Sequence, residues 1–277
     1  MHKRSVLITG ASSGIGYDAA HGLAARGWRV FATCRKEADC ARLRGEGLES
    51  FRLDYTDAGS MAAALDEALE RTGGTLDALY NNGAFGLPAA AEDLPTDALR
   101  EIFETNFFGW HALTRRVIPV MRAQGHGRIV QCSSILGFTP MRWRAAYVAT
   151  KYALEGYSDV LRIEMADAGI HVSLIEPGPI TSRIRENSVP HFERWIDWRG
   201  SPRRAQYEAS VLKRLYAEKT RPDPFELPPS AVTKKLVHAL EARRPRPRYY
   251  VTTPTWIAGI ARRLLSTRMS DRIIARS

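Results

Sequence analysis

The sequence predicts an α/β fold in which helices cover both faces of a parallel sheet. Short β-branched runs alternate with Ala-rich stretches of helical periodicity over residues 5–176. Alternation at this spacing requires crossover connections, and right-handed crossovers build a parallel sheet. A glycine-rich turn links the first strand-like run to the first helical stretch. Together these observations indicate a doubly wound, Rossmann-type domain.

Each expected strand is a short apolar run bounded by turn residues. Strands are expected at residues 5–9, 28–33, 48–53, 76–80, 128–132, 171–175 and 248–251. Helices are expected at residues 14–26, 57–71, 96–120 and 145–168, with a last one from residue 230. We predict a single domain over residues 1–277. Its parts are a cofactor-binding and catalytic core (1–182), a substrate lid (183–229) and a C-terminal helix, strand and basic amphipathic tail (230–277).

The composition is that of an ordinary globular protein, with 277 residues, of which 44% are hydrophobic and 25% charged. No apolar stretch is long enough for a transmembrane helix, and no signal-like segment precedes the first strand. The three cysteines, Cys34, Cys40 and Cys132, lack metal-ligand spacing, so we expect neither a metal site nor a disulfide framework. These features predict a protein of the reducing cytoplasm.

The positive charge is concentrated near the C-terminal end. The formal net charge is +10, and residues 230–277 contain eleven Lys or Arg against two acids, which is +9. A solvated basic face explains this charge. However, residues 256–265 are apolar with flanking arginines, as helices at a membrane surface are, so a peripheral membrane contact is an open alternative. Nucleic acid is not expected, because no binding motif accompanies the charge.

Residues 183–229 interrupt the alternating pattern and are expected to be irregular. Aromatic residues occur there among charges and prolines: Phe192, Trp195, Trp198, Tyr207 and Phe225. A long loop in a compact domain is usually functional, and aromatic side chains suit a lid over a ligand cleft. The alternative is an edge subdomain that buries its own aromatics.

The first strand runs directly into the glycine-rich segment TGASSGIG at residues 9–16. Gly10 permits a sharp turn, Gly14 lets backbone approach a phosphate, and Gly16 lets the helix pack closely on the strand. The helix N-terminus then presents free N–H groups and its positive dipole end to a pyrophosphate. The expected cofactor contacts in this segment are Gly10, Ser12, Ser13, Gly14, Ile15 and Gly16.

The end of the second strand favours NADP(H) as the dinucleotide. NAD sites usually place an acid there, but in this chain Arg35 and Lys36 precede the first acid, Glu37. The guanidinium of Arg35 can pair with a 2′-phosphate, although both basic residues can also be solvated parts of a turn. Asp54 ends the third strand and either accepts from the adenine amino group or caps the next helix.

Tyr147 and Lys151 lie four residues apart on an expected helix, so they share a face. An ammonium near a phenol lowers the pKa of the phenol, which suits Tyr147 as a general acid or base for a carbonyl–alcohol pair. Ser134, just after the strand at 128–132, can donate to the substrate oxygen. Asn106 lies among aromatic residues of the helix at 96–120, where it either has a specific partner or distorts the helix by bonding to backbone.

Further motifs occur in a fixed order over residues 5–182. After the glycine-rich segment come Asn81-Asn82-Gly83-Ala84, Asn106, Ser134, Tyr147-x-x-x-Lys151 and Pro177-Gly178-Pro179-Ile180. In this combination they resemble the short-chain dehydrogenase/reductase family. The strand end at Cys34-Arg35 and the extended C-terminal part resemble its branch of hydroxysteroid and retinol dehydrogenases and related bacterial aldehyde reductases.

The resemblance implies a role for each matched position. Tyr147 would donate the proton, Lys151 would bind the nicotinamide ribose and tune the phenol, and Ser134 would orient the carbonyl. Asn106 would hold a water that links Lys151 to solvent. The remaining cofactor contacts would be Asn82 and Gly83 near the adenosine half, and Pro177, Gly178, Ile180 and Ser182 around the nicotinamide.

Two positions depart from the family pattern without losing a chemical group that hydride transfer needs. The usual Ala-Gly after the asparagine pair is Gly83-Ala84, where both residues stay small. The usual threonine after the Pro-Gly motif is Ser182, which keeps the hydroxyl.

We therefore expect an NADP(H)-dependent oxidoreductase that acts on an apolar aldehyde, ketone or alcohol. A 3-oxoacyl thioester reductase is the enzymatic alternative. A non-catalytic NADP(H)-binding sensor is the alternative from another class. Assembly into a homo-oligomer is compatible with the resemblance.

Overall fold

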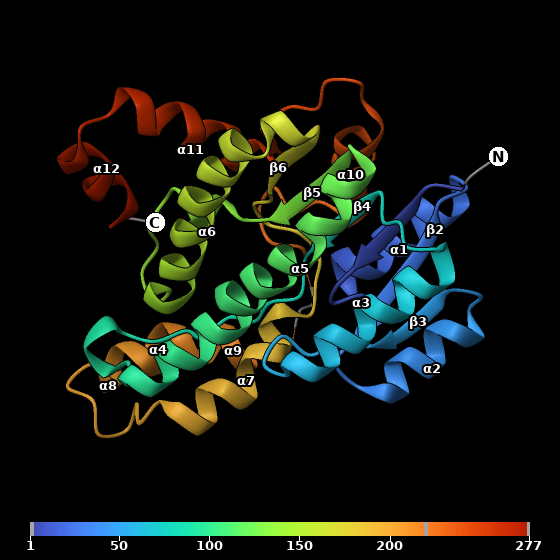
Figure 1. The fold of residues 1–277 in the computed structure, drawn as a ribbon. Coiled ribbons are helices and arrows are strands. Elements are labelled where there is room, and N and C mark those ends of the chain that lie inside the picture. The colour runs from blue at the N-terminus through green and yellow to red at the C-terminus, as the bar shows by residue number, and fades with distance from the viewer. Residues whose placement is uncertain (1–2, 219–220, 276–277) are drawn as a thin grey trace.

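The computed structural model describes residues 3–218 and 221–275 (Figure 1). Within these residues seven strands form one parallel sheet in the order β3-β2-β1-β4-β5-β6-β7. Their bounds are β1 Ser5–Ile8, β2 Arg29–Cys34, β3 Glu49–Arg52, β4 Ala78–Asn81, β5 Gly127–Cys132, β6 Ile170–Glu176 and β7 Arg248–Tyr250. Each strand overlaps a predicted run, so the predicted α/β fold is confirmed. The strand order reverses between β1 and β4, where doubly wound folds form their ligand crevice.

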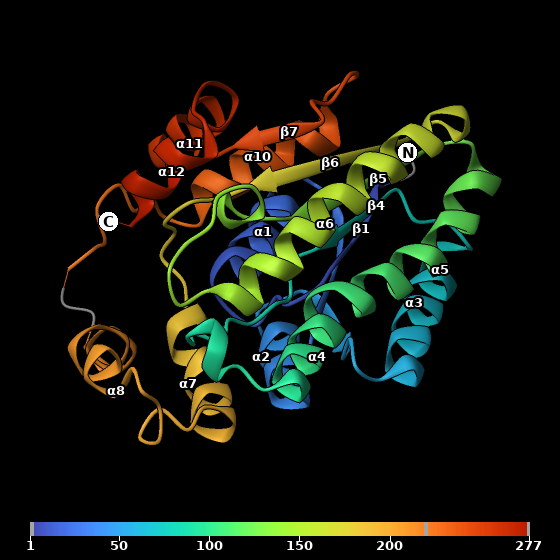
Figure 2. The same cartoon turned by 90° about the vertical axis from the view of Figure 1, so that its left-hand side faces the viewer.

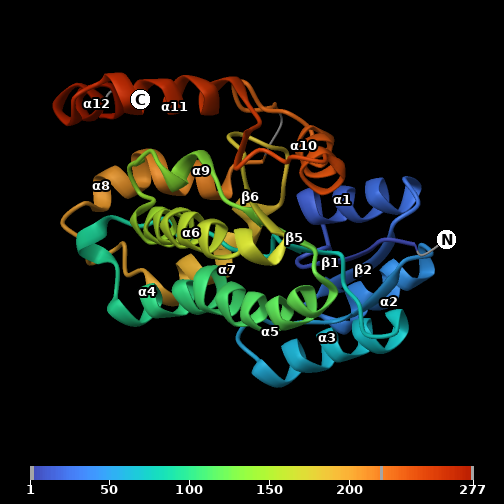
Figure 3. The same ribbon diagram turned by 45° about the horizontal axis from the view of Figure 1, so that its top comes forward.

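Helices cover both faces of the sheet. α1 (Gly14–Ala25) and α10 (Ser230–Glu241) pack against each other on one face (Figure 3). α3 (Ala58–Thr72), α5 (Gly109–Gln124) and α6 (Ala145–Glu164) cover the opposite face (Figure 2). The central strands are buried on both sides as a result, which explains why they are continuous apolar runs in the sequence.

α2 (Glu37–Gly45) was not among the predicted helices. Only Cys40 and Leu43 of its nine residues are buried, so the sequence shows no apolar face there. Acidic side chains in its first turn and arginines in its last turn match the helix dipole and favour the helix instead.

The helix predicted at 96–120 is divided in the structure. α4 (Thr96–Phe103) continues through a π-helical turn (Glu104–Phe108) into α5. Single π turns inside α-helices are frequent at functional sites. Asn106 lies within this turn and is fully buried, so the widened turn places a polar side chain inside the protein.

Residues 183–229 are largely helical, so the prediction of an irregular segment is wrong. The segment contains α7 (Ile184–Trp195), α8 (Arg204–Gln206), a π turn (Tyr207–Val211) and α9 (Leu212–Tyr216). The period of α7 is weak in the sequence because only Ser188 and Phe192 are buried and Pro190 interrupts the pattern. Short 3₁₀ turns elsewhere in the chain span Ala91–Asp93, Ile135–Gly137 and Ala166–Ala168.

Two aromatic residues of this segment belong to a second apolar cluster, separate from the core around the sheet. Phe192 is 1% exposed and Tyr207 is fully buried. They pack with residues from the loop after β4, from α4 and from α6: Phe85, Leu87, Ala90, Ala98, Ile102 and Ala146. These two aromatics are therefore buried against residues of the cofactor-binding and catalytic core (1–182), not only among residues of their own segment. Phe225, by contrast, is 64% exposed.

The chain continues after β7 through α11 (Thr253–Leu264) and α12 (Thr267–Ile274). Arg262 of α11 lies over the Tyr152 ring of α6, 5.9 Å from its centroid. Within the described ranges, none of the helices combines the length and apolarity that crossing a bilayer requires.

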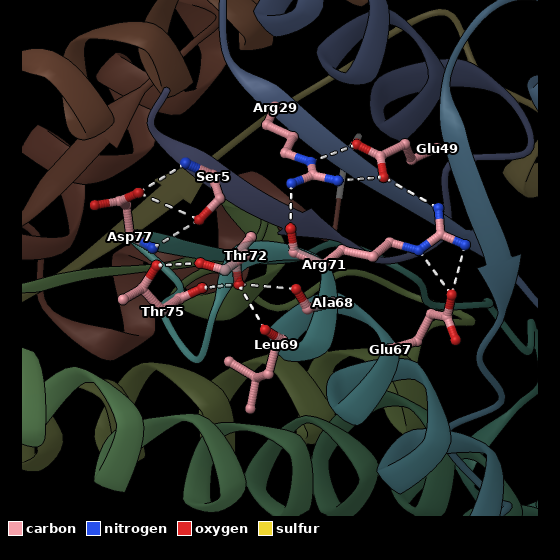
Figure 4. A network of polar contacts seen from close by, with 10 residues as sticks. All are labelled: Ser5, Arg29, Glu49, Glu67, Ala68, Leu69, Arg71, Thr72, Thr75 and Asp77. Atoms are coloured by element: carbon pink, nitrogen blue, oxygen red, sulfur yellow. Dashed lines mark hydrogen bonds and ion pairs between the residues drawn. The ribbon is translucent and has the colours of Figure 1, made fainter. Parts of the chain in front are cut away.

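A polar network stabilises the amino ends of the strands (Figure 4). Asp77, just before β4, accepts hydrogen bonds from the backbone N–H and the hydroxyl of Ser5 at the start of β1. Glu49, at the start of β3, accepts from Arg29 at the start of β2 and from Arg71 of α3. These groups lie at the amino ends of the strands. The predicted site residues lie at the opposite end of the sheet, beyond the carboxyl ends of the strands.

Candidate active site

The turn after β1 has a backbone shape that favours glycine. Gly10 and Gly14 have φ values of +64° and +58°. A Cβ at Gly10 would lie 2.5 Å from the Cα of Gly83, and a Cβ at Gly16 would clash with the Gly10 carbonyl oxygen. The turn therefore has room for backbone alone, which fits a phosphate cradle at the start of a helix.

Ser12, Ser13 and Ile15 are only partly buried in this turn and at the start of α1. Ser13 is the N-cap residue of α1, but its side chain makes no capping hydrogen bond. The first N–H groups of a helix need partners from outside the helix. The residues present thus fit the phosphates of a dinucleotide.

Asn82 ties the turn after β4 to the glycine turn. Its Nδ2 donates to the carbonyl oxygens of Thr9 and Gly10, at 3.2 Å each. The Thr9 hydroxyl accepts from the Asn82 N–H at 2.9 Å. Gly83 then lies directly against Gly10, so the Gly83-Ala84 order preserves the close approach of the two turns.

Arg35 is exposed just beyond the end of β2, close to α7. Burial is the main cause that lowers the pKa of His191 in α7, and the charge of Arg35 contributes to this lowering. The His191 ring is stacked on Phe85, with 3.7 Å between ring centroids. α7 therefore packs on the loop after β4.

Asp54 closes a local turn after β3. Its Oδ1 accepts from the Thr56 N–H at 3.0 Å and from the Thr56 hydroxyl at 2.9 Å. The N-cap of α3 is Asp57, whose side chain accepts from the Ser60 N–H. The alternative that Asp54 caps this helix is therefore wrong, and its contact with an adenine stays a prediction.

Tyr147, in the first turn of α6, interacts with Ser134, which follows β5. The Ser134 hydroxyl accepts from the Leu136 N–H at 3.1 Å, which fixes its position. Burial raises the pKa of Tyr147 and Cys132 adds to this effect, whereas the Ser134 side chain and the charge of Arg144 lower it. The net direction is opposite to the lowering expected from the Tyr147–Lys151 spacing, because burial outweighs the Ser134 contact and the charge of Arg144. The phenol is therefore neutral at physiological pH.

Lys151 is buried beside Tyr147, with only 1% of its surface exposed. Its Nζ donates to the Cys132 carbonyl at 2.8 Å and lies 4.2 Å from the centroid of the Trp110 ring and 5.6 Å from that of Tyr147. Burial lowers the pKa of Lys151 to about 8, with Cys132 and Glu155 acting in the opposite direction. The amine thus keeps its proton at neutral pH.

The side chain of Asn106 bonds to backbone at both ends of its amide. Its Oδ1 accepts from the Phe85 N–H at 3.1 Å, and its Nδ2 donates to the Phe85 carbonyl at 2.9 Å. Nδ2 also approaches the Thr150 hydroxyl at 3.5 Å, next to Lys151. This side chain therefore holds the loop after β4 close to α6. Of the two alternatives expected for Asn106, the structure favours hydrogen bonding to backbone within a distorted helix. A water held by Asn106 stays a proposal.

Trp110 joins the two halves of the site, although it was not among the predicted site residues. Its Nε1 donates to the Gly83 carbonyl at 2.9 Å, while its ring faces the Lys151 amine. The sequence signal was its position one helical turn after Asn106.

The segment after β6 completes the site beside Ser134. The Pro177 carbonyl accepts from the Ile135 N–H at 2.8 Å. Gly178 lies so close to Thr252 that a Cβ there would clash with the threonine hydroxyl. Both contacts hold the segment at the carboxyl end of β6, where the resemblance expects the nicotinamide.

The last two predicted contacts lie where the core meets the helices of residues 183–229. Ile180 pairs with Leu227 in a parallel bridge. Ser182 lies opposite Gly14, and its Cβ would be 3.4 Å from a Cβ built on that glycine. The glycine turn and the start of this segment therefore face each other across the crevice.

The sequence model of short chain dehydrogenases matches residues 4–192, which is more than half of the chain. The chain belongs to the short-chain dehydrogenase family. It is therefore an oxidoreductase of a family that uses a nicotinamide cofactor, as the resemblance implied.

Named relatives agree with this assignment. The chain is 38% identical over 272 residues to the uncharacterized oxidoreductase YbbO of Escherichia coli K12, covering 98% of this chain and 94% of that protein. It is 36% identical over 191 residues to human retinol dehydrogenase 8, covering 65% and 60%. A Burkholderia phymatum short-chain dehydrogenase/reductase, solved in complex with NAD, has the same fold with a TM-score of 0.78 and 24% identity, covering 99% and 96%.

Replacing Tyr147 with phenylalanine tests the role of the hydroxyl. Tyr147→Phe is expected to lower kcat by about 10²- to 10⁴-fold, the range that a general acid contributes. NADPH affinity, measured by the fluorescence of the bound dinucleotide, should change little. Tyr152→Phe, on the next turn of α6 and 38% exposed, is the matched control and should behave as wild type. Normal turnover by Tyr147→Phe would refute the assignment.

Proposed function

We propose that the protein is an NADP(H)-dependent oxidoreductase that interconverts an apolar aldehyde or ketone and the corresponding alcohol. The observation that carries this proposal is the convergence of Tyr147, Ser134 and buried Lys151 beside a glycine turn shaped for a dinucleotide. The bound nicotinamide would supply or accept the hydride.

The side chains of the site would polarise the carbonyl oxygen and transfer a proton to it. The Ser134 hydroxyl donates to the carbonyl oxygen as negative charge develops there. Tyr147 is neutral in its buried setting and gives its proton to that oxygen. One hydride on carbon and one proton on oxygen convert the carbonyl into the alcohol, and the reverse transfers oxidise it.

Lys151 makes the loss of the Tyr147 proton easier. A buried ammonium close to the phenol ring stabilises the phenolate that forms when the proton leaves. Asn106 of the π turn approaches Thr150 of α6, the residue next to Lys151. A water held there would return a proton from solvent.

The apolar substrate is inferred from the surroundings of Tyr147. Its ring packs against the second apolar cluster, together with Trp143 and Trp195. Residues 183–229 supply Phe192, Ile196 and Tyr207 to that cluster, so they would form the wall of a substrate site next to the phenol.

The preference for NADPH is testable at Arg35. Arg35→Ala is expected to raise KM for NADPH about 10- to 100-fold, because a hydrogen bond to a charged group contributes about 1.5–3 kcal/mol. KM for NADH and kcat should change little. Dinucleotide oxidation is followed by absorbance with a panel of aldehydes, ketones and 3-oxoacyl thioesters.

The control for this experiment is Arg100→Ala, in an exposed ion pair with Asp97 away from β2. Equal KM values for NADPH and NADH in the wild type would contradict the NADP preference. Reduction of the 3-oxoacyl thioesters alone would favour the 3-oxoacyl alternative. Binding of NADPH with no turnover on any member of the panel would favour the sensor.

We also infer that α11 and α12 bind the surface of an anionic membrane. Apolar side chains of α11 are exposed on neighbouring turns: Trp256, Ile257, Ile260 and Leu264, with exposed fractions of 47%, 61%, 56% and 77%. Arginines flank them at positions 262, 263, 268 and 272. An exposed apolar face bordered by arginines is typical of interfacial helices.

Vesicle sedimentation tests the membrane contact. Wild-type protein is expected to sediment with phosphatidylglycerol vesicles, less with phosphatidylcholine vesicles, and less as salt screens the charges. Ile260→Ser with Leu264→Ser should abolish this binding, whereas Ile184→Ser, at an exposed apolar residue of α7, should not. Equal sedimentation of the double variant and the wild type would contradict the inference.

A further inference from the structure

Arg144 lies at the start of α6, three residues before Tyr147. Its carbonyl accepts from the Val148 N–H at 2.8 Å, and a parallel bridge pairs its backbone with Ala89 in the loop after β4. The adjacent Trp143 packs on Tyr207, with 5.0 Å between ring centroids. The Arg144 side chain therefore extends from a rigid position between the catalytic helix and residues 183–229.

The guanidinium of Arg144 has no acidic partner among the residues that the structure describes. Burial, as the largest cause, and the positive charges of Arg214 and Arg185 together lower the pKa of Arg144 to about 10, while Tyr147 acts in the opposite direction. No carboxylate of a described residue is among the groups that shift the pKa of Arg144. Two other cations and the catalytic phenol therefore act electrostatically on this guanidinium.

The two neighbouring arginines already share one carboxylate. Arg185 of α7 and Arg214 of α9 pair with Asp223 at 3.4 Å and 3.2 Å. Arginine keeps its charge in proteins, and a partly buried cation without a counter-ion costs free energy. A ligand that brings negative charge would remove this cost.

Arg248 shows how the same chain treats a structural arginine. This half-buried guanidinium contacts three carboxylates, those of Glu155 at 3.0 Å, Asp159 at 2.8 Å and Glu176 at 3.1 Å. The chain thus surrounds this arginine with acids. Among the residues that the structure describes, no carboxylate is paired with Arg144 in the same way.

We propose that Arg144 binds an anionic group of the substrate, a carboxylate or a phosphate, and so selects an amphipathic carbonyl compound. The planar guanidinium matches either group bidentately, and the cluster around Tyr147 accommodates the apolar part. Arg185 and Arg214 add to the positive potential on the side of residues 183–229. This inference rests on the proposed function and narrows its substrate class.

A matched pair of substrates tests the selection. With NADPH, wild-type protein is expected to show kcat/KM at least about tenfold higher for 8-oxooctanoate than for octanal, mainly through KM. Arg144→Met should reduce the ratio of the two values to about one, since a charge-assisted contact is lost. Arg142→Met, at an exposed neighbour, should preserve the ratio. A wild-type ratio near one, or an unchanged ratio in Arg144→Met, would overturn the proposal.

Binding without turnover separates this proposal from the proposed function. Octanoate, 4′-phosphopantetheine and 1-octanol are titrated against intrinsic tryptophan fluorescence. If octanoate binds more tightly than octanol and Arg144→Met removes this difference, the ligand is a carboxylate. If only 4′-phosphopantetheine binds more tightly than octanol, the ligand is the phosphate of a carrier. Equal affinities for all three overturn the anion site. If these differences hold while neither aldehyde oxidises NADPH, the proposed function fails and the anion site stands.

Discussion

A lysine ammonium buried in the protein is the constraint on which the rest of the site depends. The Lys151 amine is held by the Cys132 carbonyl at 2.8 Å and faces the Trp110 ring at 4.2 Å. Removing a charge from water is costly unless its partners are well placed, so β5, α5 and α6 must meet in one register. That register also places Tyr147 one turn before the lysine and Ser134 beside the phenol.

The partners of the lysine also fix the dinucleotide turn. Trp110 faces the amine with its ring and donates to the Gly83 carbonyl with its indole N–H. Gly83 in turn lies against Gly10, where no Cβ fits. One tryptophan therefore couples the chemical half of the site to the cofactor half, and a shift of α5 would disturb both.

The strands and the Tyr147–Lys151 pair could be predicted because each leaves a local signal, an apolar run or a spacing of one helical turn. The helices between residues 184 and 216 could not, because few of their residues are buried and charges obscure the period. The raised pKa of Tyr147 and the lack of a counter-ion at Arg144 depend on burial and on charges from distant segments. The spacing of residues along the chain predicts neither the pKa of Tyr147 nor the missing counter-ion of Arg144 among the described residues.

Titration of Lys151 itself tests the central claim most directly. NMR of protein labelled with ¹³C in the lysine side chains follows all seven lysines without cofactor or substrate. One signal is expected to titrate near pH 8, because burial lowers the pKa of Lys151 to about 8, and to be absent from folded Lys151→Met. If the signal lost in that variant instead titrates near the ordinary lysine value of about 10.4, the amine is solvated and the account is wrong.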